Sequence, residues 1–368
     1  MEDSYIEVDL PFESDPALLE QYIGAFTSVR IGRIMEDLDS LAGSIAYKHV
    51  LPEGADARDA SKSGLYVVTA AVDRLDMLRP LSPDEPEDLR LSGHVYSVGR
   101  STMEVTVRLQ SISRRKGLRD TPETILLGRF TMACRDKETG KARPVPQLVT
   151  EGEDEIMLEK LGKEQRDKKL AQMQRSLQVV PPDADESKML HRVFTQFQDY
   201  YRDGANVPEE VVWMRKGTQL NSVLMCHPQE RNVHGNIFGG YLMRLAYEAA
   251  YSTGCLFARS PIVFLALDEL AFKAPVVVGS LLQLTTAVTF SPIENYSQHK
   301  SFQVSVEAAT VNLHTGEKKV TNTFHYTFSS KEPLKRFILP ETYLDGLSWL
   351  ESMRRREVGR ELRQLYAS

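Results

Sequence analysis

The sequence predicts an α+β fold that contains one structural unit twice, each copy being a long central helix wrapped by a curved antiparallel sheet. Two long apolar helices each begin beside a glycine, Gly32 and Gly240, and these glycines are 208 residues apart. Segments with strand-like alternation follow each helix, and no helix comes between consecutive strands. That order favours an antiparallel sheet over a doubly wound parallel sheet.

The first predicted helix covers residues 31–50. Its apolar residues recur at spacings of three and four, which gives the helix one broad apolar face. Strand-like segments follow, such as residues 103–109, in which every second residue is apolar. The apolar positions of the helix are Ile31, Ile34, Met35, Leu38, Leu41, Ala42 and Ile45.

The second copy repeats this order. An apolar helix is predicted from residue 239 to about residue 256, and residues 302–306 and 324–328 then alternate as strands do. Residues 72–80 match residues 267–275 at an offset of 195, which is smaller than the offset of the helices. The first copy therefore contains 13 more residues between its helix and this strand.

A polar run at residues 52–64 accounts for these extra residues, because it has the composition of a loop and no apolar period. Repeats of this length indicate duplicated domains rather than a solenoid. We predict an N-terminal domain at 1–150, a charged helical linker at 151–195, a C-terminal domain at 196–335 and a helical tail at 336–368. The arginines of the tail are expected on a solvated face; they are Arg354, Arg355, Arg356, Arg360 and Arg363.

Composition excludes several classes of protein. The chain has 368 residues, 42% of them hydrophobic, which is enough for two ordinary cores. Its 45 basic and 51 acidic residues give no general attraction to nucleic acid, so no nucleic-acid partner is expected. No apolar run reaches the length of a transmembrane helix. Three widely spaced cysteines without a Cys-x-x-Cys pair predict no metal site, no redox cofactor and a reducing compartment.

Three motifs carry a resemblance to a known family. The second copy contains CHPQERN at 226–232, which runs into IFGGYLMR at 237–244, and the first copy contains GRIMEDLDSL at 32–41. With these motifs the chain, from Ser4 to about Tyr343, resembles the double-hotdog acyl-coenzyme A thioesterases. The resemblance implies a tandem hotdog fold and the hydrolysis of fatty acyl-CoA to free fatty acid and coenzyme A, without a cofactor.

The resemblance also implies an Asn in the loop before one helix and an Asp on the facing helix of the other hotdog. The Asn position lies eight residues before the helix-start glycine, and it holds Asn232 in the second copy but Gly24 in the first. The Asp position lies seven residues after that glycine, and it holds Asp39 in the first copy but Tyr247 in the second. Each copy keeps one half of the pair, so we expect a single composite site of Asp39 and Asn232.

The chemistry of these residues supports the same site. Asp39 lies at the margin of the apolar face, where partial desolvation raises the pKa of a carboxylate toward the range of a general base. Backbone N–H groups at Gly239 and Gly240, where the second helix begins, are expected to receive an oxyanion. Asn232 has a donor and an acceptor and is expected to hold the attacking water or the substrate carbonyl. Whether Asp39 acts as a base or as a nucleophile that forms an anhydride stays open.

Other residues are candidates beside this pair. Glu36 and Glu248 are rival bases. Arg231 and Arg244 flank the catalytic loop, and they are expected to bind the phosphates of coenzyme A. His234 is a further candidate for contact with the substrate.

Two other functions are compatible with the same fold. A hydroxyacyl-thioester dehydratase normally pairs a His with the acid, and no His lies in the first turns of either helix. A non-catalytic acyl-CoA-binding module needs only the groove. The acyl chain length stays open in each case.

The assembly and the location are expected from the resemblance and from the fold. Open sheet edges favour a homo-oligomer, and the resemblance implies a trimer of double hotdogs. The resemblance also implies mitochondria, although the acidic start at residues 1–4 is unlike an Arg-rich presequence. We expect that a presequence has been removed from this chain, and a cytoplasmic location is the alternative.

Overall fold

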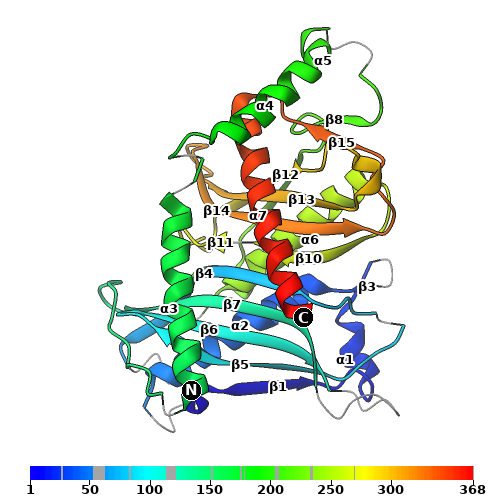
Figure 1. Cartoon of the computed structure of the whole chain (residues 1–368). Coiled ribbons are helices and arrows are strands. Elements are labelled where there is room, and N and C mark those ends of the chain that lie inside the picture. Colours follow the sequence, from blue (N-terminus) through cyan, green and yellow to red (C-terminus); the bar gives the residue numbers. More distant parts are fainter. Residues whose placement is uncertain are drawn as a thin grey trace.

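An antiparallel sheet of eleven strands, with helices on both faces, forms the centre of the molecule (Figure 1). The α+β class and the antiparallel sheet are therefore confirmed. Most of the polar run predicted as a loop at 52–64 lies outside the described residues. The computed structural model describes residues 1–25, 28–52, 63–82, 84–112, 122–150, 152–174, 176–177, 179–203, 207–232, 235–268 and 270–367.

The order of the strands across the sheet is β1-β5-β6-β7-β4-β10-β14-β13-β12-β9, and β11 pairs with β4. The three alternating segments identified in the sequence lie in β6, β13 and β14. The strands are β1 (Ile6–Leu10), β4 (Leu65–Met77), β5 (Leu89–Val98), β6 (Thr102–Ser111), β7 (Glu123–Asp136), β9 (Leu220–Met225), β10 (Ile262–Leu267), β11 (Leu270–Ala271), β12 (Leu281–Phe290), β13 (Ser301–Val311) and β14 (Lys318–Ser330).

The first five strands of this order belong to the first half of the chain and the last five to the second half. The halves meet where β4 pairs with β10, with Leu75 opposite Leu267 and Asp76 opposite Ala266. At the offset of 195, residues 262–267 of β10 correspond to residues 67–72 of β4, so strands at equivalent positions in the sequence pair with each other across the junction. A single continuous sheet results.

One long helix of each half packs against the same face of this sheet. These helices are α2 (Ile31–Val50) and α6 (Gly239–Ala258), and α6 ends two residues beyond its predicted end. All seven residues of the predicted apolar face of α2 are buried. The apolar periodicity therefore identified the face that packs against the sheet.

The two helices cross at close range because each has a glycine where it meets the other. A Cβ atom on Gly240 would lie 2.9 Å from Cα of Glu36, and a Cβ atom on Gly32 would lie 3.2 Å from Cγ of Arg244. The glycines are equivalent in the repeat, and so are Glu36 and Arg244. The contact is therefore nearly symmetric.

The opposite face of the sheet carries two further helices, α3 (Glu153–Gln174) and α7 (Tyr343–Ala367) (Figure 1). A Cβ atom on Gly162 of α3 would lie 2.7 Å from Cβ of Ser97 on β5. On α7, Ser352 donates a hydrogen bond to Thr289 of β12 over 3.0 Å. Part of the segment predicted as a linker thus packs against the first half of the sheet.

The prediction of a solvated face is wrong for three arginines of α7. Their guanidinium groups bond to polar side chains of neighbouring segments, two of them on the sheet, while Trp349 and Leu350 of the same helix are buried. Arg360 is exposed, as predicted, and the side chain of Arg363 lies outside the described residues. The three contacts are Arg354 with Glu186, Arg355 with Gln303 and Arg356 with Ser301.

A small second core lies between α4 and β15, at the end of the molecule farthest from β1 (Figure 1). Strand β8 pairs in parallel with β15 there. None of the described helices is long and apolar enough to cross a membrane. The remaining elements are η1 (Glu2–Ser4), α1 (Pro16–Glu20), β2 (Ile23–Gly24), β3 (Ser28–Val29), α4 (Ala184–Gln196), α5 (Gln198–Asp203), β8 (Val211–Trp213), η3 (Pro228–Glu230), η4 (Tyr296–Gln298) and β15 (Phe337–Leu339).

Candidate active site

Asp39 lies on α2 at the crossing with α6, and its side chain is buried, with 1% of the residue exposed. The hydroxyl of Thr69 on β4 donates a hydrogen bond to Asp39 Oδ1 over 2.7 Å. Oδ2 is also buried, and no group among the described residues completes a hydrogen bond with it. One carboxylate oxygen is thus fixed and the other is left available.

The available oxygen faces the start of α6. A Cβ atom on Gly239 would lie 3.2 Å from Asp39 Oδ2, so the missing side chain leaves space beside this oxygen. No side chain caps α6 at Phe238, so the N–H groups of its first turn are not satisfied by a cap. The structure therefore brings Asp39, Gly239 and Gly240 together at the positive end of a helix dipole.

The surroundings of Asp39 raise its pKa to about 6, and burial is the main cause. The hydrogen bond from Thr69 lowers the pKa, as does the backbone N–H of Gly240, which lies near the carboxylate without completing a hydrogen bond, and the negative charge of Glu36 raises the pKa. No cation pairs with Asp39 in the described part of the chain. A carboxylate with a pKa near 6 can accept a proton at neutral pH and still be ionised beforehand.

Asn232 lies in the loop that leads into α6. Its side-chain Oδ1 accepts a hydrogen bond from the N–H of Asn236 over 3.2 Å, and its own N–H donates to the carbonyl of Asn236 over 2.7 Å. Gly235 completes the turn with a φ of +81°, a conformation that favours glycine. Asn232 is therefore held at the same end of α6 as Asp39. His234 lies outside the described residues.

The two arginines predicted to bind phosphate differ in their surroundings. Arg231 is exposed on the loop before α6. Arg244 lies inside the helix crossing, where it forms an ion pair of 2.9 Å with Glu36, and its guanidinium carbon is 5.0 Å from the centre of the Tyr241 ring. Phosphate binding stays a prediction for both, and the contacts of Arg244 favour a role between the helices.

The rival bases both pair with arginines. Glu36 is held by Arg244 and, over 3.2 Å, by Arg33. Glu248 accepts two hydrogen bonds from Arg30, over 2.6 and 3.0 Å. A carboxylate engaged by a guanidinium is less available to a substrate water, although burial raises the pKa of Glu36 despite its two arginines. Asp39 has no such partner among the described residues, which favours it over both.

The equivalent place at the start of α2 is filled by apolar side chains. Tyr247 occupies the position of Asp39, and its ring lies edge to face against Phe264, with ring centres 5.7 Å apart. At the offset of 195, Phe264 occupies the position of Thr69. Ile31, which is buried, occupies the position of Gly239. The start of α2 therefore has no counterpart of the Asp39 carboxylate, of the Thr69 hydroxyl or of the space at Gly239.

Two residues at the site, Thr69 and Phe272, were not singled out in the sequence. Thr69 lies in an ordinary strand sequence, and only its replacement by Phe264 at the offset of 195 distinguishes it. Phe272 follows β11, and its ring atom Cζ would lie 3.2 Å from a Cβ atom on Gly239. It thus borders the same space as Asp39 Oδ2.

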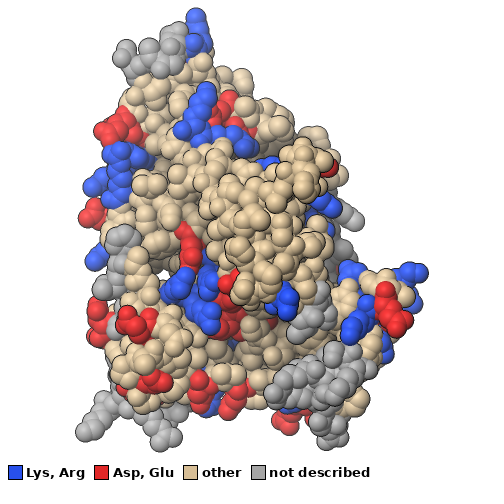
Figure 2. Space-filling view, turned by 180° about the vertical axis from the view of Figure 1, so that it is seen from behind, with Lys and Arg blue, Asp and Glu red and all other residues tan. Residues whose placement is uncertain are grey.

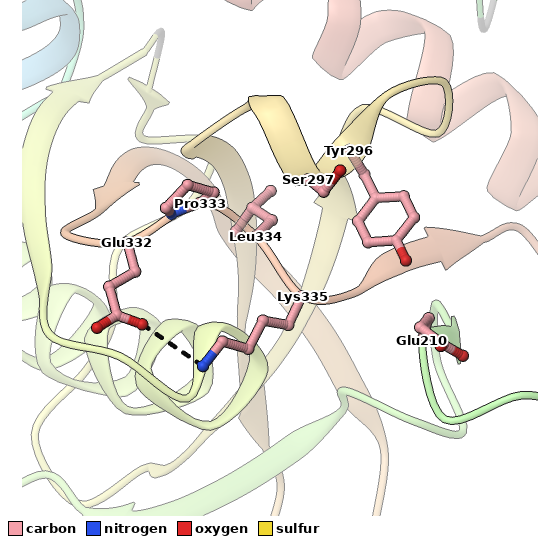
Figure 3. Close-up of a pocket in the computed structure, with 7 residues that line it drawn as sticks. All are labelled: Glu210, Tyr296, Ser297, Glu332, Pro333, Leu334 and Lys335. Atoms are coloured by element: carbon pink, nitrogen blue, oxygen red, sulfur yellow. Dashed lines mark ion pairs between the residues drawn. The ribbon is translucent and has the colours of Figure 1, made fainter.

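A shallow pocket of about 500 Å³ lies elsewhere, between η4 and the segment after β14 (Figure 3). Two of its three charged residues, Glu332 and Lys335, pair with each other over 3.5 Å. None of the residues discussed for the site lines it. Within the described residues, no group of three or more His, Cys, Asp and Glu side chains could hold a metal ion.

The raised pKa of Asp39 predicts that this residue destabilises the fold. Burial favours the protonated form, so stability falls as the pH rises from about 4 through 6, and above pH 6 the ionised form costs about 3 kcal/mol. Asp39→Asn is therefore expected to raise the melting temperature at pH 8 and to change it little at pH 4. Scanning calorimetry at both values, with Tyr247→Phe as the control, measures this. An equal change at both pH values would contradict it.

Comparison with known proteins connects this site to a family. No protein-family model matches the chain. The human mitochondrial acyl-coenzyme A thioesterase 9 is 37% identical over 359 residues, which are 96% of this chain and 77% of the relative. A chloroplastic acyl-coenzyme A thioesterase 2 from Humulus lupulus is 32% identical over 93% of this chain and 78% of its own.

One solved structure is similar over most of the chain. It is a putative oleoyl thioesterase from Lactobacillus plantarum, with a TM-score of 0.51 and 7% identity over 89% of this chain and 95% of its own. At this identity the likeness concerns the fold alone. The two sequence relatives each match more than nine-tenths of this chain, and both are named as acyl-coenzyme A thioesterases. The chain therefore belongs to the acyl-coenzyme A thioesterases, which are thioester hydrolases.

Proposed function

We propose that the chain is a tandem hotdog enzyme that hydrolyses fatty acyl-CoA at one composite site between its halves. In this proposal Asp39 of the first half is the general base. Asn232 and the backbone N–H groups of Gly239 and Gly240 come from the second half. The observation that carries the proposal is the buried Asp39 carboxylate, which has one oxygen free of hydrogen bonds and directed at an uncapped helix start.

The reaction requires no group beyond these residues, the thioester and water. Asp39 takes a proton from a water molecule as the water oxygen attacks the thioester carbonyl carbon. The N–H groups at the start of α6 stabilise the oxyanion, and Asn232 holds the water or the carbonyl. The carbon–sulfur bond then breaks, and Asp39 returns its proton to the thiolate. The products are the free fatty acid and coenzyme A.

Thr69 and Gly239 fit this role for Asp39. The Thr69 hydroxyl fixes Oδ1, so the carboxylate cannot turn away from the start of α6. Gly239 leaves room for a reacting atom beside Oδ2, and Phe272 closes that space from the other side. Exclusion of bulk water strengthens each electrostatic interaction at the site.

The tandem arrangement is supported by the equivalence of the two halves. In each half an edge strand precedes the long helix and the other strands of the sheet follow it, and the strands β4 and β10, which come directly after the helices, pair at the junction. The names of the mammalian relatives support a mitochondrial location for this chain. Arg231 and His234 remain the candidates for contact with the phosphates and the substrate.

The first test is the release of coenzyme A, followed with a free-thiol reagent on the full chain. Asp39→Asn is expected to lower kcat by about two to four orders of magnitude, the usual contribution of a positioned general base. Asn232→Ala is expected to lower kcat by less, because it removes one polar contact. Tyr247→Phe is the matched control, since it changes the position equivalent to Asp39 at the start of α2, where apolar side chains fill the corresponding space. Near-normal turnover by Asp39→Asn would exclude the proposed site.

A second test uses the space beside Asp39 Oδ2. The Cβ atom of Gly239→Ala would fill this space, so kcat is expected to fall by at least about tenfold while the fold survives. Ile31→Val is the matched control, because it changes the equivalent position at the start of α2 and costs the core only about 1 kcal/mol. Equal turnover by the two variants would contradict the proposal. Circular dichroism checks that both variants fold.

A homo-oligomer is also proposed, because both edges of the sheet carry exposed apolar side chains. Val8 on the edge strand β1 is 47% exposed, and Val223 and Met225 on β9 are 57% and 43% exposed. Exposed edge strands with apolar side chains favour association. Light scattering is expected to give a mass above that of one chain, and Val223→Lys is expected to lower it. A monomer at working concentration would contradict this expectation.

A further inference from the structure

The ion pair between Glu36 and Arg244 lies at the centre of the crossing between α2 and α6. The two side chains are 12% and 16% exposed, and their charged atoms are 2.9 Å apart. Arg33 also contacts Glu36, but it is 36% exposed and so is screened by solvent. Seen from the side of α2 and α6, acidic and basic side chains gather where the two halves of the molecule meet (Figure 2). Arg244 is therefore the better buried of the two cations that hold Glu36.

The backbone of Glu36 is closely packed at this place. It lies on the backbone stretch against which Gly240 packs, with Glu36 Cα only 2.9 Å from where a Cβ atom on Gly240 would lie. It is also one helical turn before Asp39, so the two carboxylates share a side of α2. Two poorly solvated carboxylates at this spacing oppose each other's ionisation.

The charges around the two carboxylates come from few groups. The charge of Glu36 raises the pKa of Asp39, while the hydroxyl of Thr69 on β4 and the nearby N–H of Gly240 lower it without carrying a net charge. The charged groups that act on Glu36 are Arg244 on α6, Arg33 and Asp37 on α2, and Glu230 in η3. Burial raises the pKa of Glu36, and among the charges around it Arg244 acts most strongly in the opposite direction, toward the ionised form.

We propose that Arg244 is a positioning residue for the reaction, because it neutralises Glu36 and so keeps Asp39 in its ionised, basic form near neutral pH. This inference rests on the proposed role of Asp39 as the base. Without Arg244, the charge of Glu36 acts on Asp39 through a poorly screened region. The mechanism does not require Arg244 to touch the substrate.

The test is the pH dependence of kcat/KM for the full chain between pH 5 and 9, measured by thiol release, because this profile reports the pKa of the free enzyme's base. Arg244→Met is expected to move the acidic limb of the profile to a pH about one unit higher. The value of kcat/KM then falls about fivefold at pH 6 and almost not at all at pH 8.5. Glu36→Gln is expected to move the same limb down. The double variant is expected to lie between the two.

Two further variants keep the test decisive. Arg244→Lys keeps the charge, so its acidic limb is expected near that of the unchanged enzyme, even if Arg244→Met folds poorly. A limb that does not move in Arg244→Met, or that moves the same way in Glu36→Gln, would overturn the inference. So would a pH-independent rise in KM for acyl-CoA that is absent with a short thioester lacking the nucleotide, since that result indicates phosphate binding by Arg244. Normal turnover by Asp39→Asn would instead refute the proposed function itself.

Discussion

The close crossing of α2 and α6 is the constraint on which the rest of the structure depends. Gly32 and Gly240 let each helix approach the backbone or the side-chain stem of the other. At that distance a carboxylate on one helix lies beside the N–H groups that begin the other helix. A side chain at either glycine would separate the helices and remove Asp39 from the start of α6. The same two glycines thus determine the packing and the chemistry.

The site is assembled at the expense of stability. A buried carboxylate without a cation is costly, and the raised pKa of Asp39 measures that cost. The fold tolerates it because Asp39 lies within a large core that both halves share. The hydrogen bond from Thr69 and the helix dipole offset part of the cost, but neither supplies a full charge. A complete counter-ion would stabilise the fold, but it would lower the pKa of Asp39 and weaken it in its proposed role as the base.

The repeat in the sequence was sufficient to predict much of this arrangement. Two offsets located both helices, both glycines and the unequal residues Asp39 and Tyr247, because spacing along a helix determines which residues share a face. Thr69 was missed because a strand threonine has no motif, and its partner Asp39 is adjacent only after folding. The contacts of Arg244 and of the α7 arginines could not be predicted either, since a charge pattern does not show which surface covers it.

The asymmetry of the site follows from joining the two copies in one chain. In a symmetric dimer of identical chains, each substitution would occur in both helices of such a crossing. A residue on the two-fold axis at its centre would then contact the same residue of the other chain. Glu36 and Arg244 occupy that central position, and they can attract each other only because the two copies have different sequences. The same freedom allowed Tyr247, Phe264 and Ile31 to close one place with aromatic and aliphatic packing. The apolar packing at the start of α2 stabilises the crossing of the helices. The start of α6 can then keep the Asp39 carboxylate, which destabilises the crossing.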